Sequence, residues 1–285
     1  MADRFPDPFP PPFASAWGDD ANGVWAEFKV RSEGKARGVV QRLRWIEPGT
    51  FLMGSLEDEP ERLDDEGPRH AVTLTRGFWL ADSACTQALW RAVTGTNPSR
   101  FTGDGERPVE QLSWDGELQR FLRALEGLLP SCEAALPTEA EWEYACRAGS
   151  DTPFSFGANI TPELVNYNGN HPYAGGEKGL YRKETVPVKS LPANGWGLYE
   201  MHGNVWEWCA DGRRLYDGQA QQDPEGPVLD GPEALRVVRG GSWMHGAGRA
   251  RSARRYAGHP GIVAGFVGFR LRLRSIEPGQ ARRAR

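Results

Sequence analysis

The pattern of apolar and polar residues along the chain predicts short strands toward both ends and helices only in the middle. Residues 24–30 and 39–46 have the β-branched and aromatic content of strands, and the polar segment 32–35 between them indicates a hairpin. Four more segments have the same strand character: residues 51–54, 70–74, 236–239 and 267–273. The acidic loop 57–66 is expected to be a solvated surface.

Apolar residues recur at helical spacing in three segments of the chain. Thr86 is placed to cap a short helix, and Ser113 is placed to start a second one. The third helix carries a capping box, in which the Thr138 hydroxyl accepts from the amide of Glu141 and the Glu141 carboxylate reaches back. After residue 150 the helical periodicity disappears, and loops rich in asparagine and glycine predominate.

The composition bounds the fold class and excludes some partners. The 285 residues include 35 glycines, 22 prolines and 11 tryptophans, which favours a loop-rich α+β domain held together by large aromatic side chains. We expect one domain over residues 40–275, an N-terminal extension with a strand over 1–39 and a basic tail over 276–285. The net charge of −4 argues against a nucleic-acid partner. No apolar run of about 18 residues offers a membrane span.

The cysteines and the first residues indicate the compartment. The segment that follows Met1 lacks the basic and apolar regions of a signal peptide, so we expect the chain in the cytoplasm. Four scattered cysteines, with no C-x-x-C pair, are too few for a disulfide scaffold or a structural zinc site: Cys85, Cys132, Cys146 and Cys209. The oligomeric state cannot be read from these features.

The first 22 residues form an arm with an unusual composition. Residues 5–13 alternate phenylalanine with proline, a pattern that cannot form a helix or the interior of a sheet. Two interpretations stand side by side. The arm is either a disordered leader or a polyproline-like strap that docks its phenylalanines on the domain or on another subunit.

Five motifs, in this order and spacing, resemble those of the formylglycine-generating enzyme (sulfatase-modifying factor) family. They lie at residues 49–55 (GTFLMGS), 136–145 (LPTEAEWEYA), 194–208 (NGWGLYEMHGNVWEW), 239–243 (RGGSW) and 268–271 (GFRL). The resemblance covers about residues 44–273. It implies a C-type-lectin-like α+β fold with little regular secondary structure, a fold that serves both enzymes and proteins that only bind ligands.

The residues do not match the catalytic chemistry known in the family. The resemblance implies two copper-binding cysteines after the GGS motif, but the last cysteine is Cys209 and His245 stands at the first of these positions. No two histidines have the spacing of the H-x3-H-x-E iron site. A triad of Ser242, His245 and Asp211 can be drawn, but Ser242 belongs to a fold-forming motif. We therefore expect neither copper nor iron, and no catalytic residue.

The resemblance also implies calcium sites, because family members bind this ion through loop carbonyls and an acidic side chain. The first site consists of Gly203, Asn204, Val205 and Glu207. The alternative for this segment is a network of hydrogen bonds to loop amides, without an ion. A second site would use Asn166 and Tyr167, but Lys178 stands where the family has an aspartate.

One further position bears on the compartment. In secreted relatives the cysteine of the capping-box helix pairs with a cysteine just after the GFR motif. Here Cys146 is present, but Leu271 takes the place of its partner. We expect Cys146 to be a buried thiol in a reducing compartment.

The loops between the GGS and GFR motifs are expected to form a ligand-binding surface. Its candidate residues are Trp243, Met244, His245, Gly246, Ala247, Tyr256, Ala257, His259, Ile262, Val263, Ala264 and Phe266. The apolar run 262–267 is either a buried strand or an exposed patch. Four arginines, Arg249, Arg251, Arg254 and Arg255, lie close to this surface and match the rim of an interface, although the segment 251–254 also resembles ordinary scaffold of the family.

The function predicted from these features is binding without catalysis, with a protein or another macromolecule as the partner. The loops resemble those of variable proteins of diversity-generating retroelements, which use a lectin-like fold and diversify residues just before the last GFR strand. A binding protein of the same family without diversification is an equal interpretation. The alternative from another class is a metal-dependent enzyme of the sulfatase-modifying factor family with unrecognised chemistry.

Overall fold

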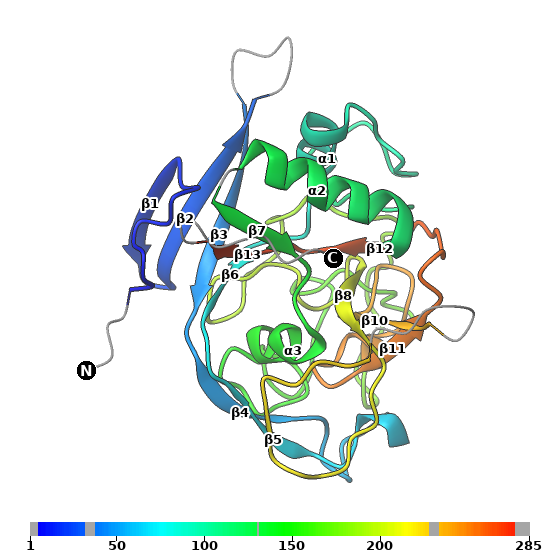
Figure 1. Ribbon diagram of the computed structural model, residues 1–285. Coiled ribbons are helices and arrows are strands. Elements are labelled where there is room, and N and C mark those ends of the chain that lie inside the picture. The colour runs from blue at the N-terminus through cyan, green and yellow to red at the C-terminus, as the bar shows by residue number, and fades with distance from the viewer. Residues whose placement is uncertain (1–4, 32–37, 130, 228–233, 277–285) are drawn as a thin grey trace.

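Mixed sheets with short helices beside them form the computed structural model, which describes residues 5–31, 38–129, 131–227 and 234–276 (Figure 1). The largest sheet has the strand order β1 (Ala16–Asp20), β2 (Gly23–Val30), β3 (Val39–Ile46), β6 (Phe78–Ala81), β13 (Arg272–Ser275), β7 (Cys132–Ala135). A second sheet has the order β11 (Arg255–Gly258), β10 (Arg236–Arg239), β8 (Trp206–Gly212), β12 (Val267–Phe269). The third consists of β4 (Gly49–Met53), β5 (His70–Leu74) and β9 (Gln221–Gln222).

The predicted hairpin and the predicted helices are confirmed. Strands β2 and β3 pair antiparallel, although the turn expected at 32–35 lies outside the described residues. Helix α1 (Gln87–Thr94) is capped by Thr86, and α3 (Glu139–Arg147) begins with both hydrogen bonds of the predicted capping box. Ser113 also caps a helix, but its first turn is a π-helix (η2, Trp114–Leu118) that leads into α2 (Gln119–Leu128).

The N-terminal arm is part of the fold. Residues 16–20, which we assigned to the arm without a strand of their own, form the edge strand β1 on β2. Phe13 is 6% exposed and belongs to the main core, where its ring centroid lies 6.3 Å from that of Trp79. Phe9 packs against this core and lies 5.3 Å from the Trp17 ring. Docking of the arm on the domain is therefore confirmed for Phe9 and Phe13.

The strand predicted over residues 267–273 divides into two strands in different sheets. β12 pairs with β8, and β13 pairs with β6 and β7. The break falls at Arg270, whose guanidinium donates to the carbonyls of Ala81 and Tyr199 at 2.9 and 2.7 Å. A fully buried arginine thus joins the two sheets where the chain passes between them.

Within the described residues, no helix is long and apolar enough to cross a membrane.

Candidate functional site

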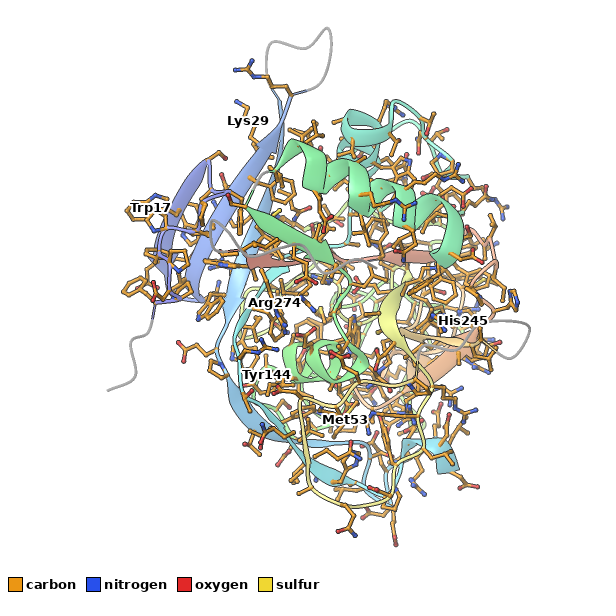
Figure 2. The ribbon with its side chains drawn as sticks, viewed as in Figure 1. Trp17, Lys29, Met53, Tyr144, His245 and Arg274 are labelled. Atoms are coloured by element: carbon orange, nitrogen blue, oxygen red, sulfur yellow. The ribbon has the colours of Figure 1, made fainter. Side chains whose placement is uncertain are left out.

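Tyr256 and Phe266, two of the residues predicted for the ligand surface, lie near His245, on the side of the molecule opposite Trp17 of β1 (Figure 2). Two polar groups converge on the Nδ1 atom of His245. The Ser242 hydroxyl lies 2.6 Å from it, and the Trp206 indole N–H lies 3.3 Å from it. The segment turns sharply here because Gly240 and Gly241 have φ values of 96° and 76°, which favour glycine.

Aromatic rings surround the His245 ring. Its centroid lies 5.9 Å from Trp206 and 5.3 Å from Phe266, and Trp206 in turn lies 6.0 Å from Tyr256. Tyr256 is 51% exposed and Val263 is 57% exposed, and Met244 and Ile262 are also exposed. Three segments between the GGS and GFR motifs thus expose apolar side chains.

Backbone hydrogen bonds hold the outermost loop of this surface in place. The amide of Gln111 donates to the Ala264 carbonyl at 3.1 Å, and the amide of Trp114 donates to the Pro260 carbonyl at 2.7 Å. The amide of Trp206 donates to the Phe266 carbonyl at 2.9 Å. Because the chain is fixed on both sides, Ile262 and Val263 stay exposed although they are apolar. The run 262–267 is thus an exposed patch at its start and a buried strand at its end.

We define the aromatic surface as Met244, His245, Tyr256, Ile262, Val263 and Phe266. Of the other candidates, His259 is exposed, and Gly246, Ala257 and Ala264 are partly exposed. Trp243 and Ala247 are buried, so they cannot line a surface. The Trp243 indole donates to the Gly265 carbonyl at 2.9 Å, and its ring lies 5.3 Å from Phe101.

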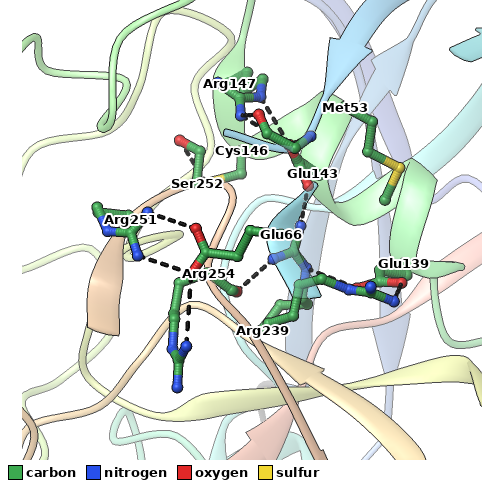
Figure 3. Close-up of polar contacts among 12 residues, drawn as sticks. Met53, Glu66, Glu139, Glu143, Cys146, Arg147, Arg239, Arg251, Ser252 and Arg254 are labelled. Carbon is green, nitrogen blue, oxygen red and sulfur yellow. Dashed lines mark hydrogen bonds and ion pairs between the residues drawn. The ribbon is translucent and has the colours of Figure 1, made fainter. Parts of the chain in front are cut away.

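Three of the four arginines expected at the rim are buried inside the molecule instead. Figure 3 shows two of them, Arg251 and Arg254, beside Glu66. Arg251 makes a two-pronged ion pair with Glu66 at 2.7 and 2.8 Å, and Arg255 makes one with Glu139 at 2.6 and 2.7 Å. Arg254 is also buried, and only Arg249 is exposed. Glu66 is fully buried as well, so the acidic loop 57–66 is not wholly a solvated surface.

The first expected calcium site does not fit an ion at Glu207. This carboxylate accepts from the Trp142 indole at 2.7 Å and from two Arg270 nitrogens at 3.0 Å each, and it is 1% exposed. The Asn204 carboxamide oxygen accepts from Asn166 at 3.1 Å and from the Val186 amide at 2.9 Å. These contacts are those of the alternative, a hydrogen-bond network. Calcium at Glu207 would have to displace Arg270.

The second expected site fits an ion better than the sequence suggested. The Asn166 carboxamide oxygen is buried and has no hydrogen-bond partner among the described residues. Such an oxygen is a suitable ligand for calcium, beside the backbone carbonyl of Tyr167. Lys178, which stands in place of the family aspartate, is exposed. Among the described residues, no three histidine, cysteine, aspartate or glutamate side chains form a group that could hold a metal ion.

The triad drawn from Ser242, His245 and Asp211 is not assembled. Asp211 accepts from the amides of Glu139 and Gly226, at 2.7 and 2.9 Å, as part of the scaffold. Ser242 does contact His245, but its side chain is fully buried. Burial, and then the charges of nearby arginines, lower the pKa of His245 to about 4, which makes it a weak base at neutral pH. The cysteines offer no nucleophile either, because all four are buried and free.

Sequence reasoning missed the role of Trp206, which we assigned to a family motif and not to the surface. Its ring packs against Tyr256, and its N–H donates to the His245 ring. Trp206 begins a strand in which every residue but Ala210 is buried, and this burial is visible in the structure and not in the sequence. A strand of this kind next to exposed loops supplies the base of a surface.

The short helices, mixed sheets and long loops define a C-type-lectin-like α+β fold. The model of the "Sulfatase-modifying factor enzyme 1-like domain" matches residues 29–275, so the chain belongs to this family. It is 37% identical to the formylglycine-generating enzyme of Streptomyces coelicolor over 230 residues, which cover 74% of this chain and 69% of the relative. It is also 29% identical over 269 residues to the serine/threonine-protein kinase pkn1 of Chlamydia caviae. This match covers 84% of this chain but only 39% of the kinase.

Two solved structures share this fold over nearly their whole length. Treponema denticola variable protein 1 superimposes with a TM-score of 0.70 at 27% identity, covering 86% of this chain and 98% of that one. PvdO from Pseudomonas aeruginosa superimposes with a TM-score of 0.65 at 25% identity, covering 87% and 98%. The predicted fold class and the predicted family are confirmed.

Proposed function

We propose that this protein is a binding protein that does not catalyse a reaction and that it captures a protein partner through the aromatic surface. One observation carries the proposal: Tyr256, Val263, Ile262 and Met244 are exposed, and Tyr256 belongs to a cluster of rings with Trp206 and His245, on a backbone fixed by hydrogen bonds. Exposed aromatic and aliphatic groups over a firm base have the composition of an interface core. The similarity to a variable protein supports the same function.

The titratable groups beside this surface also favour binding over catalysis. A cavity of about 320 Å³ lies elsewhere, between the arm and strands β3, β6 and β13. None of its lining residues belongs to the aromatic surface. An enzyme site would gather titratable groups in a pocket, whereas here Ser242 is buried and His245 is a weak base.

Two assays test this proposal. Cu(I) and a peptide with a sulfatase motif should yield no aldehyde, and formylglycine in amounts comparable to the protein would refute the non-catalytic function. For binding, a photocrosslinking residue placed at Tyr256 should capture a partner in cells, whereas the same residue at the exposed Leu215 should not. The captured partner is then purified. Its affinity should fall at least about tenfold for Tyr256→Ala combined with Val263→Asp, and unchanged affinity would exclude this surface.

Diversification, location and calcium are further parts of the proposal. A reverse transcriptase gene near a second copy of the codons for residues 240–270, differing only at adenines, would establish diversification. The four free cysteines support a cytoplasmic location. The unpartnered Asn166 oxygen supports calcium at the second of the two expected sites.

A further inference from the structure

The hydrogen bonds of His245 fix which ring nitrogen carries its proton. An indole N–H is a donor only, so the Trp206 bond requires that the Nδ1 atom of His245 accepts. The Ser242 hydroxyl then donates to the same atom at 2.6 Å. A neutral histidine has one donor and one acceptor nitrogen. The proton therefore resides on Nε2.

The Nε2–H group faces outward. Within the described residues no acceptor lies in hydrogen-bond range of Nε2, and the ring is partly exposed. The Phe266 and Trp206 rings lie at steep angles to the His245 ring, 5.3 and 5.9 Å from its centroid, and hold it in place. A single fixed donor thus stands among the apolar groups of the aromatic surface. A ligand that covers it must supply an acceptor, because a buried donor without a partner is costly.

The charge around this donor is positive. Burial, and then the charges of Arg249 and Arg254, lower the pKa of His245, so both guanidinium groups act on the ring. Arg249 is exposed and has no ion pair with a described residue. An acceptor that carries a negative charge is therefore favoured over a neutral one, since hydrogen bonds to charged groups are about twice as strong.

We propose that the aromatic surface recognises a protein segment in which an aspartate or glutamate carboxylate stands beside an apolar side chain, with His245 Nε2–H as the donor to the carboxylate and Arg249 as its counter-charge. The apolar neighbour packs on Tyr256 and Val263. This inference rests on the proposed function, because it names the chemistry of the partner for the same surface. A nucleic-acid phosphate would lack such an apolar neighbour.

Three small probes with one aromatic ring separate the parts of the proposal. Phenylacetate carries the carboxylate, phenylacetamide a neutral acceptor and 2-phenylethylammonium a positive charge. Binding is followed by the ¹H–¹⁵N signals of the His245 ring, which also report the tautomer. In the free protein we expect a protonated Nε2 and an unprotonated Nδ1. We expect phenylacetate to bind about tenfold tighter than the ammonium probe, with the affinity of the amide between the two.

Variants of the two polar groups provide the controls. Arg249→Gln should lower the affinity for phenylacetate toward that for phenylacetamide and leave the affinity for the amide unchanged. His245→Ala should abolish binding of both, His245→Gln should restore part of it through its amide donor, and Leu215→Ala should have no effect. Here binding is followed by the backbone signals of residues 262–266.

Three results would overturn the inference: a proton on Nδ1, equal binding of the carboxylate and ammonium probes, or a purified partner whose affinity survives His245→Ala. The last result would leave the proposed function standing if Tyr256→Ala still weakens that partner. Failure of the proposed function gives a different result, because then neither His245→Ala nor Tyr256→Ala would change the affinity of any partner.

Discussion

His202 should make the protein less stable in mild acid, and its surroundings allow the size of the effect to be worked out. Its Nε2 atom accepts from the amide of Ser155 at 3.0 Å, so the ring proton resides on Nδ1 and is donated to the Ala250 carbonyl at 2.6 Å. A second proton would have to enter between Nε2 and the Ser155 N–H. Burial is the main cause that lowers the pKa of His202, from 6.5 to about 4.

The sign of the effect follows from the proton counts. Between pH 6.5 and about pH 4 the unfolded chain binds a proton at His202 that the folded chain does not bind, so the free energy of unfolding falls as the pH falls. With 1.36 kcal/mol for each pKa unit, the loss between pH 8 and pH 4.5 is about 2.5 kcal/mol. Asp211 and Glu200 act in the opposite direction, because burial raises their pKa values to about 6 and about 7.

A comparison with His202→Gln isolates this contribution from those of the carboxyl groups. Urea unfolding at pH 8 and pH 4.5 should show the wild type losing about 2–3 kcal/mol more than the variant. The exposed His259 provides the control, and His259→Gln should keep the wild-type dependence on pH. If wild type and His202→Gln lose the same free energy between the two pH values, the assignment of a buried neutral ring is wrong.

Three further predictions concern the scaffold and the metal. Glu207→Gln should cost about 3–5 kcal/mol in urea unfolding, because it leaves the buried Arg270 without its counter-charge. Phe13→Ala should cost about 3–5 kcal/mol, whereas Phe5→Ala, at an exposed ring, should cost under about 0.5 kcal/mol; equal losses would argue against docking of the arm through Phe13. Millimolar calcium should raise the Tm relative to EDTA in the wild type and not in Asn166→Ala, and a Tm that does not respond in either protein would exclude the ion.

The features predicted correctly from the sequence are those set by neighbours in the chain. The capping box of α3 involves Thr138 and Glu141, three residues apart, so the sequence alone contains both partners. The hairpin of β2 and β3 is likewise local. The fold as a whole was accessible only through the resemblance of five motifs, because composition and periodicity indicated no more than a loop-rich α+β domain.

The errors share a physical cause, which is pairing between residues far apart in the chain. Arg251 and Arg255 look like surface residues, but their partners Glu66 and Glu139 lie 185 and 116 positions away. The break at Arg270 depends on carbonyls of Ala81 and Tyr199. Burial of a charge is decided by such a partner, since an unpaired charge would not be tolerated inside, and no local pattern reveals it.

The same distant pairs explain how one segment can serve both as scaffold and as display. Along β11, Arg255 turns inward to Glu139 of α3 while the next residue, Tyr256, turns outward onto Trp206. Alternation of this kind assigns stability to one set of residues and recognition to the other. The outward residues can therefore change with little effect on folding, because the inward ion pairs and the backbone bonds to Ala264 and Pro260 hold the chain without them. A surface built in this way suits a protein whose partner changes while its fold does not.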